Sequence, residues 1–147
     1  MGDVNILGLT QAETIIHIAL EHAASRNMAP LAVIVLDAGG HPLALARQDG
    51  ASPFRFDIAR AKAAGAIGMG VGSRTLATRA SRNPTFFAAL GSVLSGQLVP
   101  AAGGVLVRTA DGLLLGAVGV SGDSSDLDEA CALAGIAAVG LLADPGA

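Results

Sequence analysis

The first periodic segment of the chain begins near residue 9, where apolar residues recur every three or four positions. Thr10 followed by Glu13 is a capping-box signature, which predicts that a helix starts here and runs to about Arg26. His22 falls on the flank of this helix. One face is apolar and is expected to pack into the core; it consists of Ala12, Ile15, Ile16, Ala19 and Ala23.

Four short apolar segments separated by turn residues predict two β-hairpins. Residues 31–37 and 41–48 flank one turn, and residues 105–108 and 113–120 flank the other. No helical crossover lies inside either pair. We therefore expect an antiparallel sheet with helices packed on it, in the α+β class, rather than a doubly wound parallel sheet.

Helical patterns fill most of the remaining chain, at residues 54–69, 73–79 and 84–94, and from Ser125 or Asp126 to Leu142. The helix from residue 54 carries its charges in its first half and is uncharged after Lys62. A helix that is apolar on every side is normally enclosed, either in a core or between subunits. In residues 84–94 the expected anchors are Phe86, Phe87 and Leu90.

Composition adds a hint of self-association to this single-domain prediction for residues 1–147. Hydrophobic residues make up 52% of the chain and charged residues only 14%, against about 25% in an average protein. With so little charge to cover its surface, the protein is expected to bury part of that surface against copies of itself. The net charge of −3 and the absence of a basic run predict neither a nucleic-acid nor a membrane partner.

The first residues, MGDVNILGLTQAE, contain an early acid and no long apolar core, so they do not read as a secretory signal, and a cytoplasmic location is expected. Cys131, the single cysteine, sits among small residues and is expected to be a buried structural thiol. The glycines at 65, 68, 70 and 72 do not form a GxGxxG motif after a strand. Close helix packing explains them better than a phosphate loop.

Candidate chemistry is sparse. His17 and His22 are five residues apart, which does not place two metal ligands on one helix face, but a single histidine can be an axial haem ligand, and His22 is the best placed. Lys62 and the Asp49/Asp57 pair are the candidates for acid–base or nucleophilic chemistry, with Lys62 as a base or Schiff-base amine. The alternative is that the Lys62 ammonium pairs with a carboxylate and orients subunits.

Residues 119–123 lead from a strand towards the last helix, and their backbone amides there are candidates for binding a carboxylate or propionate. The alternative is a tight turn in which Asp126 and Asp128 are ordinary first-turn acids that complement the helix dipole.

Four segments together resemble the GlcG/HbpS family: DAGGHPLALARQDGA at 37–51, DIARAKAAGAIG at 57–68, PAAGGVLV at 100–107 and GAVGVSGDSSDLDEACALAGI at 116–136. The resemblance implies a profilin-like antiparallel sheet flanked by helices, and assembly into dimers or larger rings such as octamers. Some members bind haem, and a few relatives are implied to be cofactor-independent lyases. Many relatives carry Thr or Ser after the Lys-Ala pair, whereas Lys62-Ala63 is followed here by Ala64.

Three hypotheses follow. The first is a cytoplasmic homo-oligomer that binds haem or a similar flat, anionic ligand, with His22 as axial ligand. The second is a cofactor-independent lyase or isomerase for a small, possibly aromatic, carboxylic acid, with Lys62 or Asp49 as base. The third is an accessory protein that only assembles. The ligand-binding residues expected in the first two are Arg47, Arg55, Asp57, Gly104, Ser121, Gly122 and Asp123.

Overall fold

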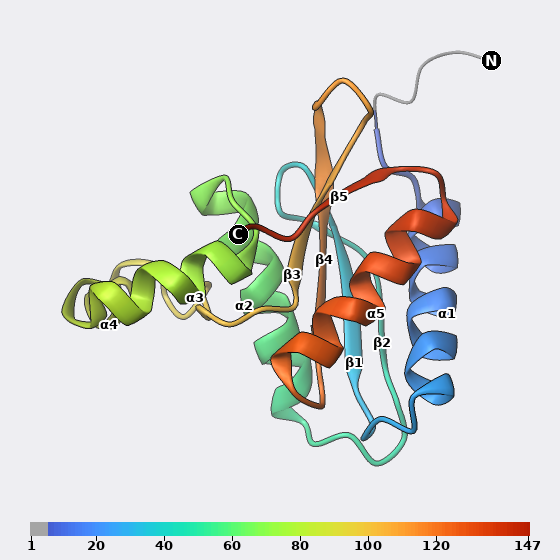
Figure 1. Cartoon of the computed structure of the whole chain (residues 1–147), viewed down its shortest axis with the longest axis horizontal. Coiled ribbons are helices and arrows are strands. Elements are labelled where there is room, and N and C mark those ends of the chain that lie inside the picture. The colour runs from blue at the N-terminus through green and yellow to red at the C-terminus, as the bar shows by residue number, and fades with distance from the viewer. Residues whose placement is uncertain (1–5) are drawn as a thin grey trace.

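The computed structural model describes residues 6–147, which form one five-stranded antiparallel sheet (Figure 1). The strands lie in the order β2-β1-β4-β3-β5. The two predicted hairpins are present, and β1 joins them by pairing with β4. The α+β class is confirmed. The strand bounds are β1 Ala32–Asp37, β2 Pro42–Arg47, β3 Gly104–Arg108, β4 Leu114–Ser121 and β5 Leu142–Asp144.

Helices cover the two faces of the sheet unequally. Helices α1 (Leu9–Ser25) and α5 (Ser125–Ala138) lie side by side on one face, and α2 (Phe54–Met69) covers the other (Figure 1). Two separate apolar clusters lie on the two faces of the sheet, because successive side chains of a strand point to opposite faces. Val33 and Val35 of β1 join the cluster under α1 and α5, whereas Ile34 and Leu36 face α2.

The predicted inward face of α1 is buried as expected, but the start of the helix differs from the prediction. The helix begins at Leu9 after Gly8, whose N–H donates to the side chain of Gln11 at 3.0 Å. Thr10 and Glu13 are exposed and form no capping box. The helix therefore starts two residues upstream of the predicted cap.

The end of the last helix is a second difference. Helix α5 stops at Ala138, four residues before the predicted Leu142. Gly140 adopts a left-handed conformation with φ of 73°, which ends the helix and turns the chain back. Residues 142–144 then pair with β3 as a fifth strand that the sequence pattern did not predict.

Helices α3 (Ser73–Arg82) and α4 (Pro84–Val93) form an arm that extends away from the sheet (Figure 1). Helix α3 runs three residues beyond its predicted end. Helix α4 has no buried residue, so the expectation that Phe86, Phe87 and Leu90 anchor it in this chain is wrong: Phe86 is 50% exposed, and the other two are half-buried.

Glycines in β3 and β4 let α2 lie directly on the sheet. A Cβ at Gly119 would stand 2.0 Å from the Ala59 carbonyl oxygen, and one at Gly104 would stand 2.2 Å from the Lys62 carbonyl oxygen. Any larger residue at either position would push the helix outward. This close approach brings the side chain of Lys62 against the end of β4.

Candidate functional site

Lys62 is buried at the centre of the contact between α2 and the sheet. Its side chain is 3% exposed, and its Nζ donates to the Val120 carbonyl at 3.0 Å and to Asp128 Oδ2 at 3.2 Å. Asp128, on the first turn of α5, is 1% exposed. The two residues form a buried ion pair that ties α2 to α5 past the end of β4.

Asp128 also closes the loop between β4 and α5. Its carboxylate accepts the N–H of Asp123 at 3.0 Å and that of Gly122 at 3.3 Å. Burial raises the pKa of Asp128 despite these hydrogen bonds and the nearby Lys62 ammonium. Burial also lowers the pKa of Lys62, and the Asp128 charge offsets only part of that effect. Asp128 therefore holds the loop in shape as well as neutralising Lys62.

A second group of polar contacts lies around this loop. Arg55 Nη1 donates to the buried Ser121 Oγ at 3.3 Å. Asp123 accepts the N–H of Ala29 at 2.8 Å and that of Ser124 at 2.7 Å, and these bonds lower the pKa of Asp123. The loop is thus fastened to the start of α2 and to the segment that follows α1.

The sheet register gathers several predicted ligand residues at one end of the sheet. Ala32, the first residue of β1, pairs with Arg47 of β2 and with Ser121 of β4. Helices α2 and α5 both start at this end, and α1 terminates there (Figure 1). Of the residues predicted from the sequence, the structure collects Arg55, Lys62, Ser121, Gly122 and Asp123 around the β4–α5 loop.

Arg47 and Asp49 lie apart from Lys62, beyond Pro30. They line an open hollow of 500 Å³ together with Met28, Pro30 and Gln48. Arg47 Nη1 donates to the Ala51 carbonyl at 2.7 Å. The two alternative bases predicted from the sequence have different surroundings: Lys62 is bonded to Asp128, whereas Asp49 is exposed on the β2–α2 loop.

Two other predicted ligand residues also lie outside the group around the loop. Asp57 is exposed on the outer face of α2, away from the sheet, and lines a different hollow. Gly104 is buried beneath α2, where its N–H donates to Ser73 Oγ at 2.7 Å. Its role in the structure is therefore to admit the α2 backbone rather than to present an amide to solvent.

The three histidines differ in their surroundings. His17 Nε2 lies 2.6 Å from Glu21 and His41 Nδ1 lies 3.3 Å from Asp37, and both pairs are exposed. His22 is half-buried, and its Nε2 is buried without a hydrogen-bond partner among the described residues. A buried polar atom without a partner is uncommon and calls for an explanation.

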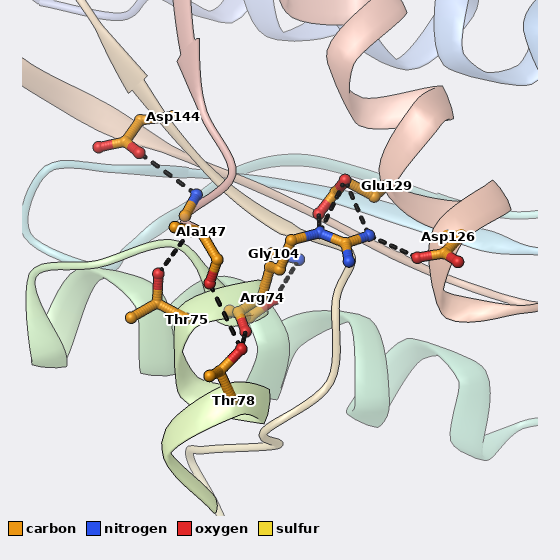
Figure 2. Close-up of polar contacts among 10 residues, drawn as sticks. Arg74, Thr75, Thr78, Gly104, Asp126, Glu129, Asp144 and Ala147 are labelled. Atoms are coloured by element: carbon orange, nitrogen blue, oxygen red, sulfur yellow. Dashed lines mark hydrogen bonds and ion pairs between the residues drawn. The ribbon is translucent and has the colours of Figure 1, made fainter. Parts of the chain in front are cut away.

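A network that the sequence did not predict fixes the arm to α5 (Figure 2). Arg74 Nε donates to Glu129 Oε2 at 3.0 Å, and Nη2 donates to Glu129 Oε1 at 3.2 Å and to Asp126. These hydrogen bonds hold the pKa of Arg74 above its ordinary value. Thr75 and Thr78 bond the chain at Ala147, which completes the attachment.

The sequence contained one usable signal for these contacts. Lys62 is followed only by uncharged residues in its helix, and pairing with a carboxylate was one of its two predicted roles, but the sequence did not say which carboxylate. The first-turn interpretation of Asp126 and Asp128 is incomplete, because Asp128 pairs with Lys62 and Asp126 with Arg74.

Two negative findings limit the chemistry of residues 6–147. No cluster of three or more His, Cys, Asp or Glu side chains could hold a metal ion there, and no helix in that range is long and apolar enough to span a bilayer. Cys131 is buried as predicted, and burial raises the pKa of its thiol to about 11. The thiolate is therefore scarce at neutral pH, which agrees with a structural role.

Comparison with solved structures supports the fold along nearly the whole chain. The crystal structure of a PduOC:heme complex is 27% identical with a TM-score of 0.83, and the match covers 93% of this chain and 97% of that one. A double mutant of HbpS from Streptomyces reticuli is 33% identical with a TM-score of 0.78, covering 95% and 90%. Klebsiella pneumoniae protein ORFY is 25% identical with a TM-score of 0.80, covering 94% and 95%.

The sequence itself matches a family model over most of its length. Residues 7–137 match the family described as haem degrading protein, HbpS-like. No match is found among curated proteins. The matched range contains the α2 segment, the β4–α5 loop and all three histidines. The chain therefore belongs to the HbpS-like family of haem degrading proteins.

Proposed function

We propose that this protein binds haem, and that it does so as a self-associated protein. The observation that carries the proposal is the similarity, over 93% of the chain, to a structure whose relative is complexed with haem. The HbpS-like family match supports the same ligand. Bound haem would bring to the protein an iron centre with open axial positions and two propionate carboxylates.

His22 fits the role of axial ligand better than the other two histidines. Its Nε2 has no hydrogen-bond partner among residues 6–147, whereas His17 and His41 each face a carboxylate. Because Nε2 is covered by the protein, coordination requires the half-buried imidazole to rotate towards solvent. We therefore expect binding to be accompanied by a local change at the last turns of α1.

Arginines at the same end of the sheet are suited to the propionates. Helix α1 ends beside the β4–α5 loop, where the Ala29 N–H reaches Asp123. Arg55 contacts Ser121 in that loop. Arg47 and Ser121 both pair with Ala32 of β1, and Arg47 lines the 500 Å³ hollow. A guanidinium presents paired donors that match a carboxylate. His22, Arg47 and Arg55 thus supply the kinds of group that haem needs.

The test is a haemin titration followed by absorbance, in which each histidine is replaced by alanine in turn. We expect a saturable Soret shift for the wild type, for His17→Ala and for His41→Ala, and a weakened or displaced shift for His22→Ala. The two control variants remove imidazoles that already have carboxylate partners. Circular dichroism of each variant confirms that α1 remains folded.

The outcomes separate the ligand from the axial residue. No shift beyond that of free haemin in the wild type would refute haem binding. A normal shift in all three variants would keep haem as the ligand and refute an imidazole axial ligand. A loss confined to His17→Ala or His41→Ala would move the site away from His22.

The surroundings of Lys62 weigh against one of the two candidate bases of the lyase or isomerase hypothesis. The Lys62 ammonium, although its pKa is lowered, is enclosed and bonded to Val120 and Asp128. Gly103 packs against the ammonium, because a Cβ at that position would lie 2.9 Å from Nζ. The geometry favours the pairing role of Lys62 over a role as base.

A further inference from the structure

A hollow on the outer face of α2 is left unfilled by residues 6–147. Two adjoining depressions of 240 and 140 Å³ share Ala64 and Gln97, and together they form what we call the α2 groove. One wall is α2 itself, and the other is the segment 94–97 that follows α4. Helix α2 lies on the opposite side of the sheet from α1, the helix that carries His22 (Figure 1).

Two glycines one turn apart on α2 shape this groove in opposite ways. A Cβ at Gly65 would lie 3.0 Å from Leu98 Cγ, so Gly65 lets the chain after α4 pack closely on the helix, where Leu98 is buried. A Cβ at Gly68 would meet nothing within 4 Å, so this position is left open. The groove therefore has a firmly packed wall beside an empty floor, as preformed ligand sites do.

The wider depression carries one charge of each sign. Asp57 and Arg60 both line it, together with the side chain of Gln97. Asp57 and Arg60 are three residues apart on α2, but neither forms an ion pair within residues 6–147. A carboxylate and a guanidinium are thus both open to a ligand in the same depression.

The narrower depression continues the groove along α2 without further charge. Ala64 lies one helical turn, about 6 Å, beyond Arg60 along the helix axis. Met69 is a flexible thioether that adapts to the shape of an apolar group. Apart from Gln97, the lining residues carry no polar side chain; they are Ala64, Gly65, Gly68, Met69 and Leu94.

This order of charged and apolar residues selects a type of ligand. A simple carboxylate would be attracted by Arg60 and repelled by Asp57, and a simple amine would meet the reverse. A molecule that carries an ammonium and a carboxylate on one carbon atom satisfies both side chains at once. An apolar substituent on that carbon then reaches the narrower depression.

We propose that the α2 groove binds a small zwitterion, an α-amino acid with an unbranched apolar side chain. Its ammonium pairs with Asp57, its carboxylate pairs with Arg60, and its side chain lies along α2 over Ala64 towards Gly68. This second binding function goes beyond haem binding and uses neither His22 nor the β4–α5 loop. Both charged residues are exposed, so salt weakens the electrostatic part of the binding.

Titration of the wild type with a matched set of ligands, by calorimetry and by ligand-observed NMR, is the first measurement. Norleucine carries both charges and a butyl side chain. Hexanoate lacks only its ammonium, pentylamine lacks only its carboxylate, and glycine lacks only its side chain. We expect saturable binding of norleucine, and binding weaker by about threefold or more for each of the other ligands.

Asp57→Asn and Arg60→Gln test the two charges separately. Asp57→Asn should weaken norleucine binding and strengthen hexanoate binding, because the repulsive carboxylate is gone. Arg60→Gln should weaken norleucine binding and strengthen pentylamine binding. A change in folding alone would not reverse these preferences. Glu13→Gln on α1 and Arg79→Gln on α3 alter exposed charges elsewhere and serve as matched controls.

Gly68→Leu tests the apolar end of the groove. The side chain of a helical residue lies over the turn that precedes it, so a leucine at position 68 would cover Ala64. Its Cβ enters open space and leucine has a higher helix propensity than glycine, so the chain should stay folded. We expect norleucine binding to fall to the level of glycine. Gly91→Leu, which also places its Cβ in open space, is the matched control.

Each contrary result has a distinct meaning. No saturable binding of norleucine by either method would overturn the inference. Equal binding of norleucine, hexanoate and pentylamine would refute recognition of a zwitterion. Norleucine binding that is unchanged in the Asp57, Arg60 and Gly68 variants, or equally weakened in the controls, would refute this site. These outcomes are independent of the haemin titration, which follows the iron centre.

Discussion

Lys62 shows how one charged side chain is accommodated beneath a helix. Its ammonium has two protein acceptors, the Val120 carbonyl and the Asp128 carboxylate, and Asp128 in turn accepts two backbone N–H groups. Every strong polar group of the pair therefore has a partner. Such a pair contributes little net stability compared with apolar residues, but the loss of one member is costly because the other remains buried and charged.

Asp128→Asn is expected to destabilise the protein by about 3–5 kcal/mol, because it leaves the Lys62 ammonium without its counter-charge. Adding Lys62→Met should recover at least half of that loss. Urea unfolding of the wild type, both single variants and the double variant measures the coupling. Additive effects of the two substitutions would contradict the pairing.

The pH dependence of Asp128→Asn gives an independent check. Without the carboxylate, the folded-state pKa of Lys62 falls further below its value in the unfolded chain. The unfolded chain then binds more protons in the interval between the two pKa values, so the stability of the variant rises with pH through that interval. A stability that stays flat between neutral pH and about pH 10 would show that Lys62 is not buried as a cation.

At the residue scale, the sequence singled out Lys62 but not its contacts. Pairing of Lys62 with a carboxylate was one of two alternatives, and the structure supplies a partner within the chain, Asp128. The choice of Asp128 over Asp123 or Asp126 depends on where α5 starts relative to the end of β4. That offset is set by the packing of the fold, so it cannot be inferred from the spacing of the acids in the sequence.

At the scale of elements, the contact between α2 and β4 depends on a single absent methyl group. The carbonyl of Ala59 occupies the space in which a side chain at position 119 would lie. The backbones of the helix and strand therefore approach more closely than ordinary side chains permit. The depth of Lys62 in the molecule follows directly from this approach.

Gly119→Ala is expected to cost about 1–3 kcal/mol or more, since the new Cβ would overlap a backbone atom that cannot rotate away. Gly91→Ala, in the exposed helix α4, adds a methyl group in open space and is expected to stabilise the protein by up to about 1 kcal/mol. Thermal unfolding under identical conditions compares the two. If both substitutions changed the thermal stability similarly, α2 would have to move away from β4 to make room for the added methyl group.

Element bounds were predictable where a local signal defines them, and less so where packing does. The hairpins and α2 follow from alternation, turn residues and alanine content, and their observed bounds lie within one or two residues of the prediction. Strand β5 was missed because three residues are too few to show alternation. Its pairing with β3 stabilises a segment that has no strong preference of its own.

At the scale of the whole molecule, the protein consists of a sheet body and an arm joined at Arg74. The guanidinium reaches two acids of α5 from the first turn of α3, and the end of the described chain packs against Thr75 and Thr78 (Figure 2). These contacts set the angle at which the arm leaves the body.

Arg74→Ala is expected to loosen the arm more than it destabilises the body. The Arg74 side chain is 38% exposed, so the free-energy loss should be only about 1 kcal/mol or less. Hydrogen exchange should become faster in α3 and α4 and stay unchanged in β1 and β4. Asp126→Asn, which alters only the more exposed partner, serves as the milder comparison, and uniform acceleration across the chain would contradict a local attachment.

The arm was the part of the molecule that the sequence described least well. Two short helices were predicted, with Phe86, Phe87 and Leu90 as anchors of the second, but what they anchor to was not specified. The pattern shows only that Phe86 and its neighbours avoid water, and it does not distinguish contact within the chain from contact with another copy.

The central position of β1 and β4 in the sheet also governs how the protein folds. The two strands pair antiparallel although their paired residues are roughly 80–90 positions apart, so the sheet cannot close until most of the chain is available. During synthesis the first hairpin emerges with the inner edge of β1 unpaired, and it remains so until β4 leaves the ribosome. This interval is when the chain is most exposed to aggregation, and shortening the connection between the hairpins should speed folding more than strengthening either hairpin.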